Sequence, residues 1–495
     1  MYRFTSLLID RNSNGLSARR TFSTRTPCRI WAIWVNCAGM SVSYHAAAVR
    51  WPGATRCIQP VAPITLVAVV AVVACVSASR PASGVEPADL ARRAGLRVVG
   101  SAHLTLITDR PERAGDGVGD LPRLFDEAVS TWTRHYRLDA ERVGAWRATG
   151  CLIVDRDRFR AAGLLPTDGS VPDFENGFCL AERFWMMDQS NPAYRRHLLF
   201  HEGVHAFTVT LLRATAPAWY TEGIAEYLAT HRLQTDPPAS PRFVAMPLPE
   251  RPADVEQLGR IERIAGLRRE RTMPSLAQIF DLPTRDHRDL GAYASSWAAV
   301  AFLSGHPAFR EAFHATELQP LDGRLTTRLR ATADWDGLRA DRDFDAFVAD
   351  LDYGYDFARM AIDWSPGGPL VAEQHAAAAA DRGWQNTGWS LAKGDRCSFT
   401  ATGRVTVGPA SARPLESEGD GITLRWYRGR PVGRLLIAQW VEPADGGRPS
   451  FQILAQGASG TCAAAADGPL YVKVNESPGD LADNAGAFTV FLTPR

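Results

Sequence analysis

The segment that decides the fold is His201-Glu202-Gly203-Val204-His205, which is followed by Trp219-Tyr220-Thr221-Glu222-Gly223-Ile224-Ala225-Glu226. On an α-helix, His201 and His205 stand one turn apart on the same face, so both imidazoles can bind one metal ion. Glu222 supplies a carboxylate oxygen as a third ligand, and water takes the fourth position of a tetrahedral zinc ion. The pattern predicts a catalytic rather than a structural zinc site.

Glu202 and Glu226 have separate predicted roles beside this ion. Glu202 is rotated by about 100° from His201, so it can lie next to the metal-bound water without binding the metal. Zinc lowers the pKa of that water to about 7, and Glu202 is predicted to accept its proton and pass it to the leaving amine. Glu226 follows Glu222 by one turn and is predicted to accept a hydrogen bond from a ligand histidine.

These two segments resemble those of the gluzincin metallopeptidases, the thermolysin-like and aminopeptidase-like enzymes. They look most like a bacterial branch in which H-E-x-x-H is followed by W-x-x-E-G-x-A-E-Y, the pattern that residues 219–227 complete. The resemblance implies that His201, His205 and Glu222 bind zinc and that Glu202 is the base. Sixteen residues separate His205 from Glu222, slightly fewer than in the best-known members.

Such enzymes usually place a Tyr or His where it stabilises the oxyanion of the reaction. Tyr293, within residues 291–297, is the candidate for this role, and His287 and Tyr220 are weaker alternatives. An aromatic side chain packed on a helix is an equally good interpretation of Tyr293. Outside the motifs the resemblance is diffuse and extends over residues 96–310.

The elements expected around the motifs predict an α+β fold, with a small sheet followed by a helical half. Asn191 can cap a helix that starts at Pro192, runs to about Leu212 and carries the two histidines. The other expected elements are strands over 96–100, 103–107 and 151–154, and helices over 121–136, from 217, and over 275–281, 292–304 and 341–351.

At 495 residues the chain is long enough for two or three domains. We expect an export segment and linker over 1–84, a zincin-like domain over 85–365 and an all-β sandwich over 370–495. The last begins after a Pro-Gly-Gly-Pro turn at 366–369, where alternating patterns separated by glycine-rich turns predict strands. Those strands are expected over 397–402, 421–427, 451–454, 470–474 and 488–492. An alanine run, 376–380, is expected to be helix or linker.

The predicted sandwich contains an acidic loop that places Glu476, Asp480, Asp483 and Asn484 close together. Oxygen donors of this kind suit calcium, although Asp, Asn and Gly are also the ordinary residues of a polar hairpin turn. The loop resembles the calcium loop of a small galactose-binding bacterial lectin, whose pattern is N-D-x-P-G-x-x-x-N-N-x-G-x-F.

An earlier strand of the same lectin resembles residues 403–409, and there a backbone carbonyl contacts the metal, as Val407 can do here. The likeness covers about 380–493 and implies a sandwich fold, a calcium site and a carbohydrate or glycoprotein ligand. In the lectin, another loop carries His and Gln to the sugar, and residues 417–421 replace that loop in this chain.

The N-terminal segment predicts export. An apolar run over 64–76 follows an arginine-rich stretch and is too short to span a bilayer comfortably, which is typical of a secretory signal. Met40 is an alternative start. Cleavage near Ala78 or Ala82 and a lipoprotein box with lipid on Cys75 are equally supported, and a single membrane anchor is a third interpretation. Each places the protein outside the cytoplasm, in the periplasm, the cell envelope or the medium.

The net charge of +1 and the lack of a basic cluster with interleaved aromatic residues argue against a nucleic-acid partner. Nearly all basic residues are arginine, and the only lysines are Lys393 and Lys473. Export permits disulfides, and the predicted domains make the pairs Cys151–Cys179 and Cys397–Cys462 plausible.

Two hypotheses of function follow. The first is an exported zinc metallopeptidase that cleaves a protein or peptide substrate with a metal-activated water and carries an accessory carbohydrate-binding sandwich. The alternative is a non-catalytic binding protein of the cell envelope, in which a degenerate zincin fold serves as a scaffold. The presence of Glu202 favours the enzyme, because a purely structural metal site has no use for that base.

Overall fold

The computed structural model describes residues 7–12, 15–20, 85–113, 115–235, 240–255, 259–283, 289–332, 335–408, 415–444 and 446–495. The chain divides into two compact units, Met1–Ser79 and Arg80–Arg495. The described part of the first unit is an antiparallel pair, β1 (Leu7–Asn12) and β2 (Gly15–Arg20). The predicted export features lie outside the described residues: Met40, the run 64–76, Cys75, Ala78 and Ala82. Among the described residues, no helix is both long and apolar enough to cross a membrane.

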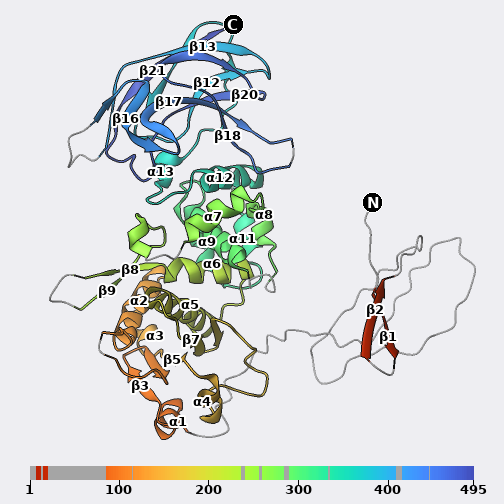
Figure 1. Cartoon of the computed structure of the whole chain (residues 1–495), viewed down its shortest axis with the longest axis vertical. Helices are drawn as coiled ribbons and strands as arrows, with labels where there is room; N and C mark the ends of the chain where they lie inside the picture. Colours follow the sequence, from red (N-terminus) through yellow and green to blue (C-terminus); the bar gives the residue numbers. More distant parts are fainter. Residues whose placement is uncertain are drawn as a thin grey trace, which may run out of the picture. The chain divides into compact units, whose positions relative to one another are not determined.

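The first sheet of the second unit is mixed and has five strands (Figure 1). Its order is β3-β4-β5-β7-β6, in which β4, β5 and β7 are parallel and the edge strands β3 and β6 are antiparallel to their neighbours. The strands are β3 (Arg97–Gly100), β4 (Leu104–Thr108), β5 (Ala148–Ile153), β6 (Gly177–Leu180) and β7 (Arg183–Met187). The three strands expected from the sequence correspond to β3, β4 and β5, whereas β6 and β7 are not predicted by it.

Helices cover both faces of this sheet, because alternate side chains of each strand point to opposite sides. One core contains α2 (Leu121–His135) and α5 (Pro192–Leu211) together with Leu106, Leu152 and Phe184 of the sheet. The other contains α1 (Pro87–Arg93) and α4 (Arg156–Ala161) together with Ile107, Ile153 and Trp185. The short helix α3 (Ala140–Gly144) precedes β5.

The helix α5 starts and ends close to where the sequence predicts. The side-chain oxygen of Asn191 accepts a hydrogen bond from the Ala193 amide at 2.8 Å, and Pro192 occupies the first helical position, where a missing N–H costs nothing. The helix ends at Leu211, one residue before the expected end. It therefore holds His201 and His205 well inside regular helix.

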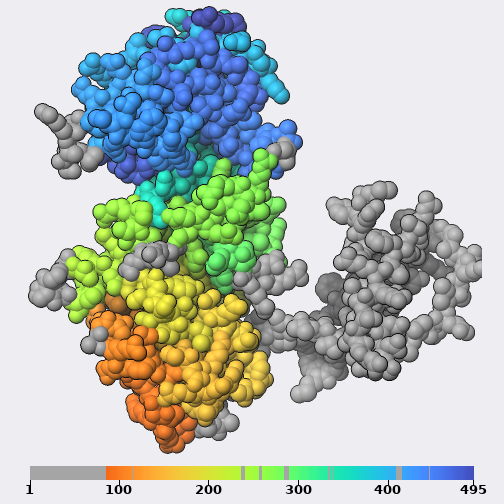
Figure 2. Space-filling model, in the orientation of Figure 1, coloured from red at the N-terminus to blue at the C-terminus, as the bar shows by residue number. Residues whose placement is uncertain are grey.

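A helical region, α6 to α13, follows α5. It consists of α6 (Ala218–Ala229), β8 (His231–Gln234), β9 (Arg242–Ala245), the 3₁₀ turn η1 (Pro252–Val255), α7 (Arg260–Arg269), α8 (Leu276–Phe280), α9 (Leu290–Gly305), α10 (Arg310–Glu317), α11 (Leu325–Arg330), α12 (Gly337–Asp350) and α13 (Phe357–Met360). The expected helices correspond to α6, α8, α9 and α12. Figure 2 shows the atoms of the sheet region, orange to yellow, packed directly against those of the helical region, green.

Two glycines allow the helices of the motif to pack closely. A Cβ on Gly203 of α5 would lie 2.4 Å from a ring carbon of Phe125 on α2. A Cβ on Gly223 of α6 would lie 2.4 Å from the carbonyl oxygen of Ser296 on α9. Since both distances are far below van der Waals contact, any larger residue would push these helices apart. The two glycines therefore fix how closely α5 and α6 approach their neighbours.

Two six-stranded sheets form the C-terminal sandwich. One has the order β10-β12-β20-β17-β16 with β18 on β17, and the other β15-β14-β21-β13-β19 with β11 on β21. Residues of both sheets, such as Val472 and Val490, share one buried core. The strands are β10 (Gly368–Pro369), β11 (Gln374–Ala379), β12 (Gln385–Leu391), β13 (Arg396–Thr402), β14 (Val405–Val407), β15 (Leu415–Ser417), β16 (Asp420–Tyr427), β17 (Arg430–Val441), β18 (Ser450–Gln456), β19 (Ser459–Ala463), β20 (Gly468–Val474) and β21 (Ala485–Pro494). The predicted α+β class, with an all-β region at the C-terminal end, is confirmed.

The expectation for the alanine run 376–380 is wrong, because most of the run lies in strand β11. β11 pairs antiparallel with β21, with Ala378 opposite Phe488. Ala378 and Ala380 are fully buried in the sandwich core. Alanine favours helices when isolated, but the ladder offered by β21 and the burial of alternate methyl groups override that preference.

The two expected disulfides have opposite outcomes. Cys397 and Cys462 face each other directly across β13 and β19 with a Cα–Cα distance of 5.4 Å, and they form the expected disulfide. Cys151 and Cys179 are both free, so the second expected pair is wrong. Their strands, β5 and β6, lie on either side of β7, and a separation of two strands is about 10 Å, beyond the reach of a disulfide.

Candidate metal centre

Two helices bring the three predicted zinc ligands together. His201 and His205 project from α5, and Glu222 projects from α6. The Nε2 atoms of the two histidines are 3.1 Å apart. The Oε2 atom of Glu222 lies 3.4 Å from Nε2 of His201 and 3.3 Å from Nε2 of His205. The three donor atoms thus form a nearly equilateral triangle.

The size of this triangle fits a tetrahedral zinc ion. Zinc binds imidazole nitrogen and carboxylate oxygen at about 2.0–2.1 Å, and tetrahedral geometry then separates the donors by about 3.3–3.4 Å. The three observed separations span 3.1 to 3.4 Å. Two histidines and one glutamate are also a donor set found in catalytic zinc sites, which keep one position for water. The chain's own residues therefore fit the metal that the sequence predicts.

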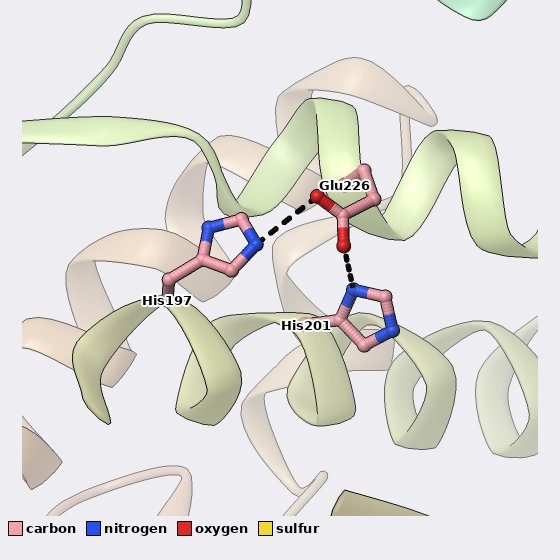
Figure 3. Close-up of side chains that lie close together, drawn as sticks. All are labelled: His197, His201 and Glu226. Carbon is pink, nitrogen blue, oxygen red and sulfur yellow. Dashed lines mark hydrogen bonds and ion pairs between the residues drawn. The ribbon is translucent and has the colours of Figure 1, made fainter. Parts of the chain in front are cut away.

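A second set of three side chains combines His201 with His197, one turn earlier on α5, and Glu226 of α6 (Figure 3). Nε2 of His197 is 3.1 Å from Oε2 of Glu226, and Nδ1 of His201 is 3.2 Å from Oε1 of Glu226. Within the described residues, these two sets are the groups of three His, Cys, Asp or Glu whose ligand atoms all lie within 4.8 Å of one another. His201 belongs to both sets and presents one ring nitrogen to each.

Arg260 makes the second set unsuitable for a cation. Its Nε and one terminal nitrogen each lie 2.7 Å from Oε2 of Glu226. A guanidinium at this distance neutralises the carboxylate and would repel a metal ion beside it. Oε1 of Glu226 instead lies at ion-pair distance from Nδ1 of His201, which makes no hydrogen bond of regular geometry among the described residues. A hydrogen bond there would leave Nε2 of His201 free to bind the metal. The contact is close to the one that its predicted role needs, and that role stays a prediction.

His197 and Arg260 are not among the residues that the sequence analysis selects. His197 lies four residues before His201, so the same one-turn spacing that pairs the two ligand histidines is a signal for it. Arg260, at the start of α7, has no comparable signal, because its contact with Glu226 spans 34 residues of sequence. Burial alone would raise the pKa of Glu226, but Arg260 and then His197 hold it well below its ordinary value.

The predicted base, Glu202, is buried on α5 beside the edge strand β6. A Cβ on Gly177 of β6 would lie only 2.2 Å from Oε1 of Glu202, so the strand leaves just enough room for this carboxylate. Burial raises the pKa of Glu202, and the positive charges of His201 and His205 oppose that shift. A carboxylate with a raised pKa is a better proton acceptor near neutral pH than an exposed one.

Tyr293 lies beside the three metal-binding candidates. Its ring on α9 is 6.0 Å from the ring of His201, centroid to centroid, in an edge-on arrangement. Burial and the nearby carboxylates of Glu222 and Glu202 raise the pKa of Tyr293, so its hydroxyl keeps the proton that an oxyanion donor needs.

The two weaker alternatives to Tyr293 differ in their outcome. The hydroxyl of Tyr220 donates to Oε1 of Glu317 at 3.0 Å and is 3.3 Å from the hydroxyl of Tyr136, within a buried network. Because the Tyr220 hydroxyl makes these contacts, it does not point toward the three donor atoms of the metal site. His287 lies outside the described residues.

We expect Glu226→Gln to weaken zinc binding by about 10–100-fold, the usual effect of losing an orienting carboxylate. The substitution removes the negative charge that holds the His201 ring in place and leaves Arg260 unpaired. Zinc affinity measured by competition with a chromophoric chelator checks this. Glu262→Gln, a change on the neighbouring helix α7, is the control and should leave the affinity unchanged. An unaltered affinity in Glu226→Gln would contradict the orienting role.

In the sandwich, the predicted calcium loop contains an unusual buried acid. Glu476 is 1% exposed, and its Oε2 atom has no hydrogen-bond partner among the described residues. The guanidinium of Arg425 is 3.9 Å from Oε1 of Glu476 and 3.7 Å from the exposed Asp480. Burial raises the pKa of Glu476 to about 7, against the opposing charge of Arg425. An unpartnered buried carboxylate oxygen fits a cation site.

The remaining predicted calcium ligands are arranged less favourably. Asp483 is exposed. The side-chain oxygen of Asn484 accepts a hydrogen bond from the Gly408 amide at 3.3 Å, and its nitrogen donates to the Ala380 carbonyl at 3.1 Å. Neither of the two sets of clustered ligand atoms in the described residues includes this loop. The calcium site stays a prediction.

Comparisons with known proteins add little to this geometry. No protein-family model matches the chain, and no curated protein matches it. Among solved structures, it is similar to one described as EclA N-terminal domain, PllA-like lectin, with 18% identity over 26% of this chain and 98% of that chain. The TM-score is 0.18, and a score of this size supports no conclusion about this protein.

Proposed function

We propose that this protein is an exported zinc-dependent peptidase. The observation that carries the proposal is the triangle formed by His201 Nε2, His205 Nε2 and Glu222 Oε2, with Glu202 beside it on the same helix. The triangle has the dimensions of a three-ligand zinc site, and the adjacent buried carboxylate is the group that a hydrolytic site needs as its base. A non-catalytic scaffold would not need this acid.

Within this proposal, the chain's own residues divide the work of hydrolysis. Bound zinc supplies a Lewis acid that acidifies water and polarises a substrate carbonyl. Glu202 accepts a proton at its carboxylate and later delivers it to the leaving amine. Glu226 fixes the ring of His201, and the hydroxyl of Tyr293 donates a hydrogen bond to the developing oxyanion.

The position of strand β6 favours an extended polypeptide as the substrate. It is an edge strand of the five-stranded sheet, and it passes directly beside Glu202 at Gly177. An extended peptide can pair with the open edge of a strand through backbone hydrogen bonds, irrespective of its side chains. A substrate bound in this way would carry its peptide bonds past the base and the metal ligands.

Removal of the metal tests the proposal most directly. The purified full-length protein should bind about one zinc ion and cleave an unfolded protein substrate. Treatment with a chelator such as 1,10-phenanthroline should abolish cleavage, and added zinc should restore it. Mass spectrometry of the products would then define the cleaved bonds. A zinc-loaded protein that leaves a broad peptide library intact would instead support the alternative, a non-catalytic binding protein of the cell envelope.

The sandwich carries a second candidate function, a calcium-stabilised module, because Glu476 has an unpartnered buried oxygen. The resemblance of its acidic loop to the calcium loop of a galactose-binding lectin makes carbohydrate or glycoprotein the proposed ligand. Calcium at 100 times its Kd should stabilise the protein by about 2.7 kcal/mol. Melting curves of zinc-saturated protein in calcium or in EGTA measure this. Glu476→Gln should remove the difference, and Glu418→Gln, an exposed acid of the same sandwich, should keep it. Identical curves in calcium and EGTA would argue against the site.

A further inference from the structure

A cavity of about 230 Å³ lies between the helical region and the sandwich. Helices α7 and α12 contribute to its wall on one side, and β17, β18 and β20 on the other. Cationic and aromatic side chains predominate among its lining residues, which include Arg268, Arg428, Arg430, Lys473, Trp384 and Phe451. This cavity is separate from the candidate metal centre and contains none of its residues.

The positive charge of this wall is only partly balanced. Asp350 is the one carboxylate among the lining residues, against four cationic side chains. Its Oδ1 accepts from Arg428 at 2.6 Å, and its Oδ2 lies 3.6 Å from Nζ of Lys473. Arg268 and Arg430 each donate to a backbone carbonyl at 3.2 Å, and neither forms an ion pair among the described residues. The lining residues therefore carry a net charge of +3, from four cations and one carboxylate. Carboxylates outside the lining also interact with this wall: Asp345 with Arg268, Asp352 with Arg428 and Glu476 with Lys473.

Lys473 is a buried cation in the wall of this cavity. It is one of only two lysines among 55 basic residues of the chain, and its side chain is 5% exposed. Its Nζ is 5.8 Å from the centre of the Trp384 ring, and Trp384 Nε1 donates to the same Asp350 oxygen at 3.1 Å. A buried ammonium is unfavourable unless an anion compensates it, and here a single carboxylate is shared with Arg428.

We propose that this cavity binds a compact anionic ligand, a carboxylate or phosphate group on a single sugar-sized ring. The guanidinium groups of Arg268 and Arg430 can bind either anion in a bidentate manner. The rings of Trp384 and Phe451, which stack on each other with centroids 4.6 Å apart, form an apolar part of the wall that the ring bearing the anion can contact. The site is independent of the proposed peptidase activity, since it shares no residue with it.

Calorimetric titration of the full-length protein at low ionic strength tests this, with glucuronate, glucose 6-phosphate and neutral glucose as probes. We expect one equivalent of at least one anion to bind and glucose not to bind. The anion that binds more tightly identifies the carboxylate or the phosphate as the preferred group. Raising the salt concentration should weaken binding, because the attraction is electrostatic.

Arg430→Gln should weaken binding at least about tenfold, as expected for loss of a charge-assisted hydrogen bond. The matched control is Arg434→Gln on the same strand, β17, because Arg434 does not line the cavity and donates to the Asp420 carbonyl. Melting curves establish that both variants fold. Failure of both anions to bind, equal binding of glucose, or unchanged binding in Arg430→Gln would each overturn the proposal.

Discussion

Glu202→Gln is expected to reduce the rate of peptide-bond cleavage by about 10²–10⁴-fold while leaving zinc bound. Glutamine keeps the size of the side chain in its tight position beside β6, but it cannot accept the proton of the attacking water. Because Glu202 is not one of the three donors of the triangle, the metal site should survive the change. Turnover of one defined peptide and metal analysis of the same sample measure the two effects.

Glu182→Gln is the matched control for this experiment. Glu182 is an exposed acid in the turn between β6 and β7, next to the edge strand β6 in sequence but outside the candidate site. The Glu182→Gln variant should keep the cleavage rate and the zinc content of the parent protein. If Glu202→Gln kept the activity of the parent protein, Glu202 could not be the base. Loss of zinc from Glu202→Gln would contradict the assignment differently, because it would make this carboxylate a metal ligand.

The pairing of His201 with His205 could be predicted because helix geometry is local. One turn separates the two histidines whatever surrounds them, and the capped start of α5 is readable from Asn191 and Pro192. The distance between Glu222 and the histidines depends on how α5 and α6 pack, and no local rule gives it. Gly203 lets α5 approach α2 and Gly223 lets α6 approach α9, and only the structure reveals these contacts.

Contacts between distant segments account for what the sequence analysis missed. Arg260 contacts Glu226 from another helix, so the spacing of residues in the motif does not predict this contact. The sequence analysis missed the hairpin of β6 and β7, which joins the sheet because β7 pairs with the earlier strand β5. Ala378 lies in a strand because β21 pairs with it, against the preference of alanine for helices. In each case the deciding neighbour lies far away along the chain.

Gly177→Ala should lower kcat by about 100-fold while leaving the fold and the zinc in place. The added methyl would lie 2.2 Å from Oε1 of Glu202, so the carboxylate would have to move by about 1 Å to regain van der Waals contact. A displacement of that size in a catalytic group costs about 10²-fold in rate. Since the obstructed atoms are the far end of a flexible side chain, the melting temperature should change little.

Two further variants make this test specific for the contact between Gly177 and Glu202. Gly144→Ala adds the same methyl group where no atom lies within 4 Å, so it should leave kcat and zinc content at parental values. Glu202→Asp withdraws the carboxylate from β6 and will itself slow the reaction. If the clash with Glu202 is the cause, adding Gly177→Ala to Glu202→Asp should cost much less than 100-fold, because contacting residues are not additive. A full 100-fold loss in both backgrounds would mean that the methyl group acts elsewhere, for example on the peptide bound along β6.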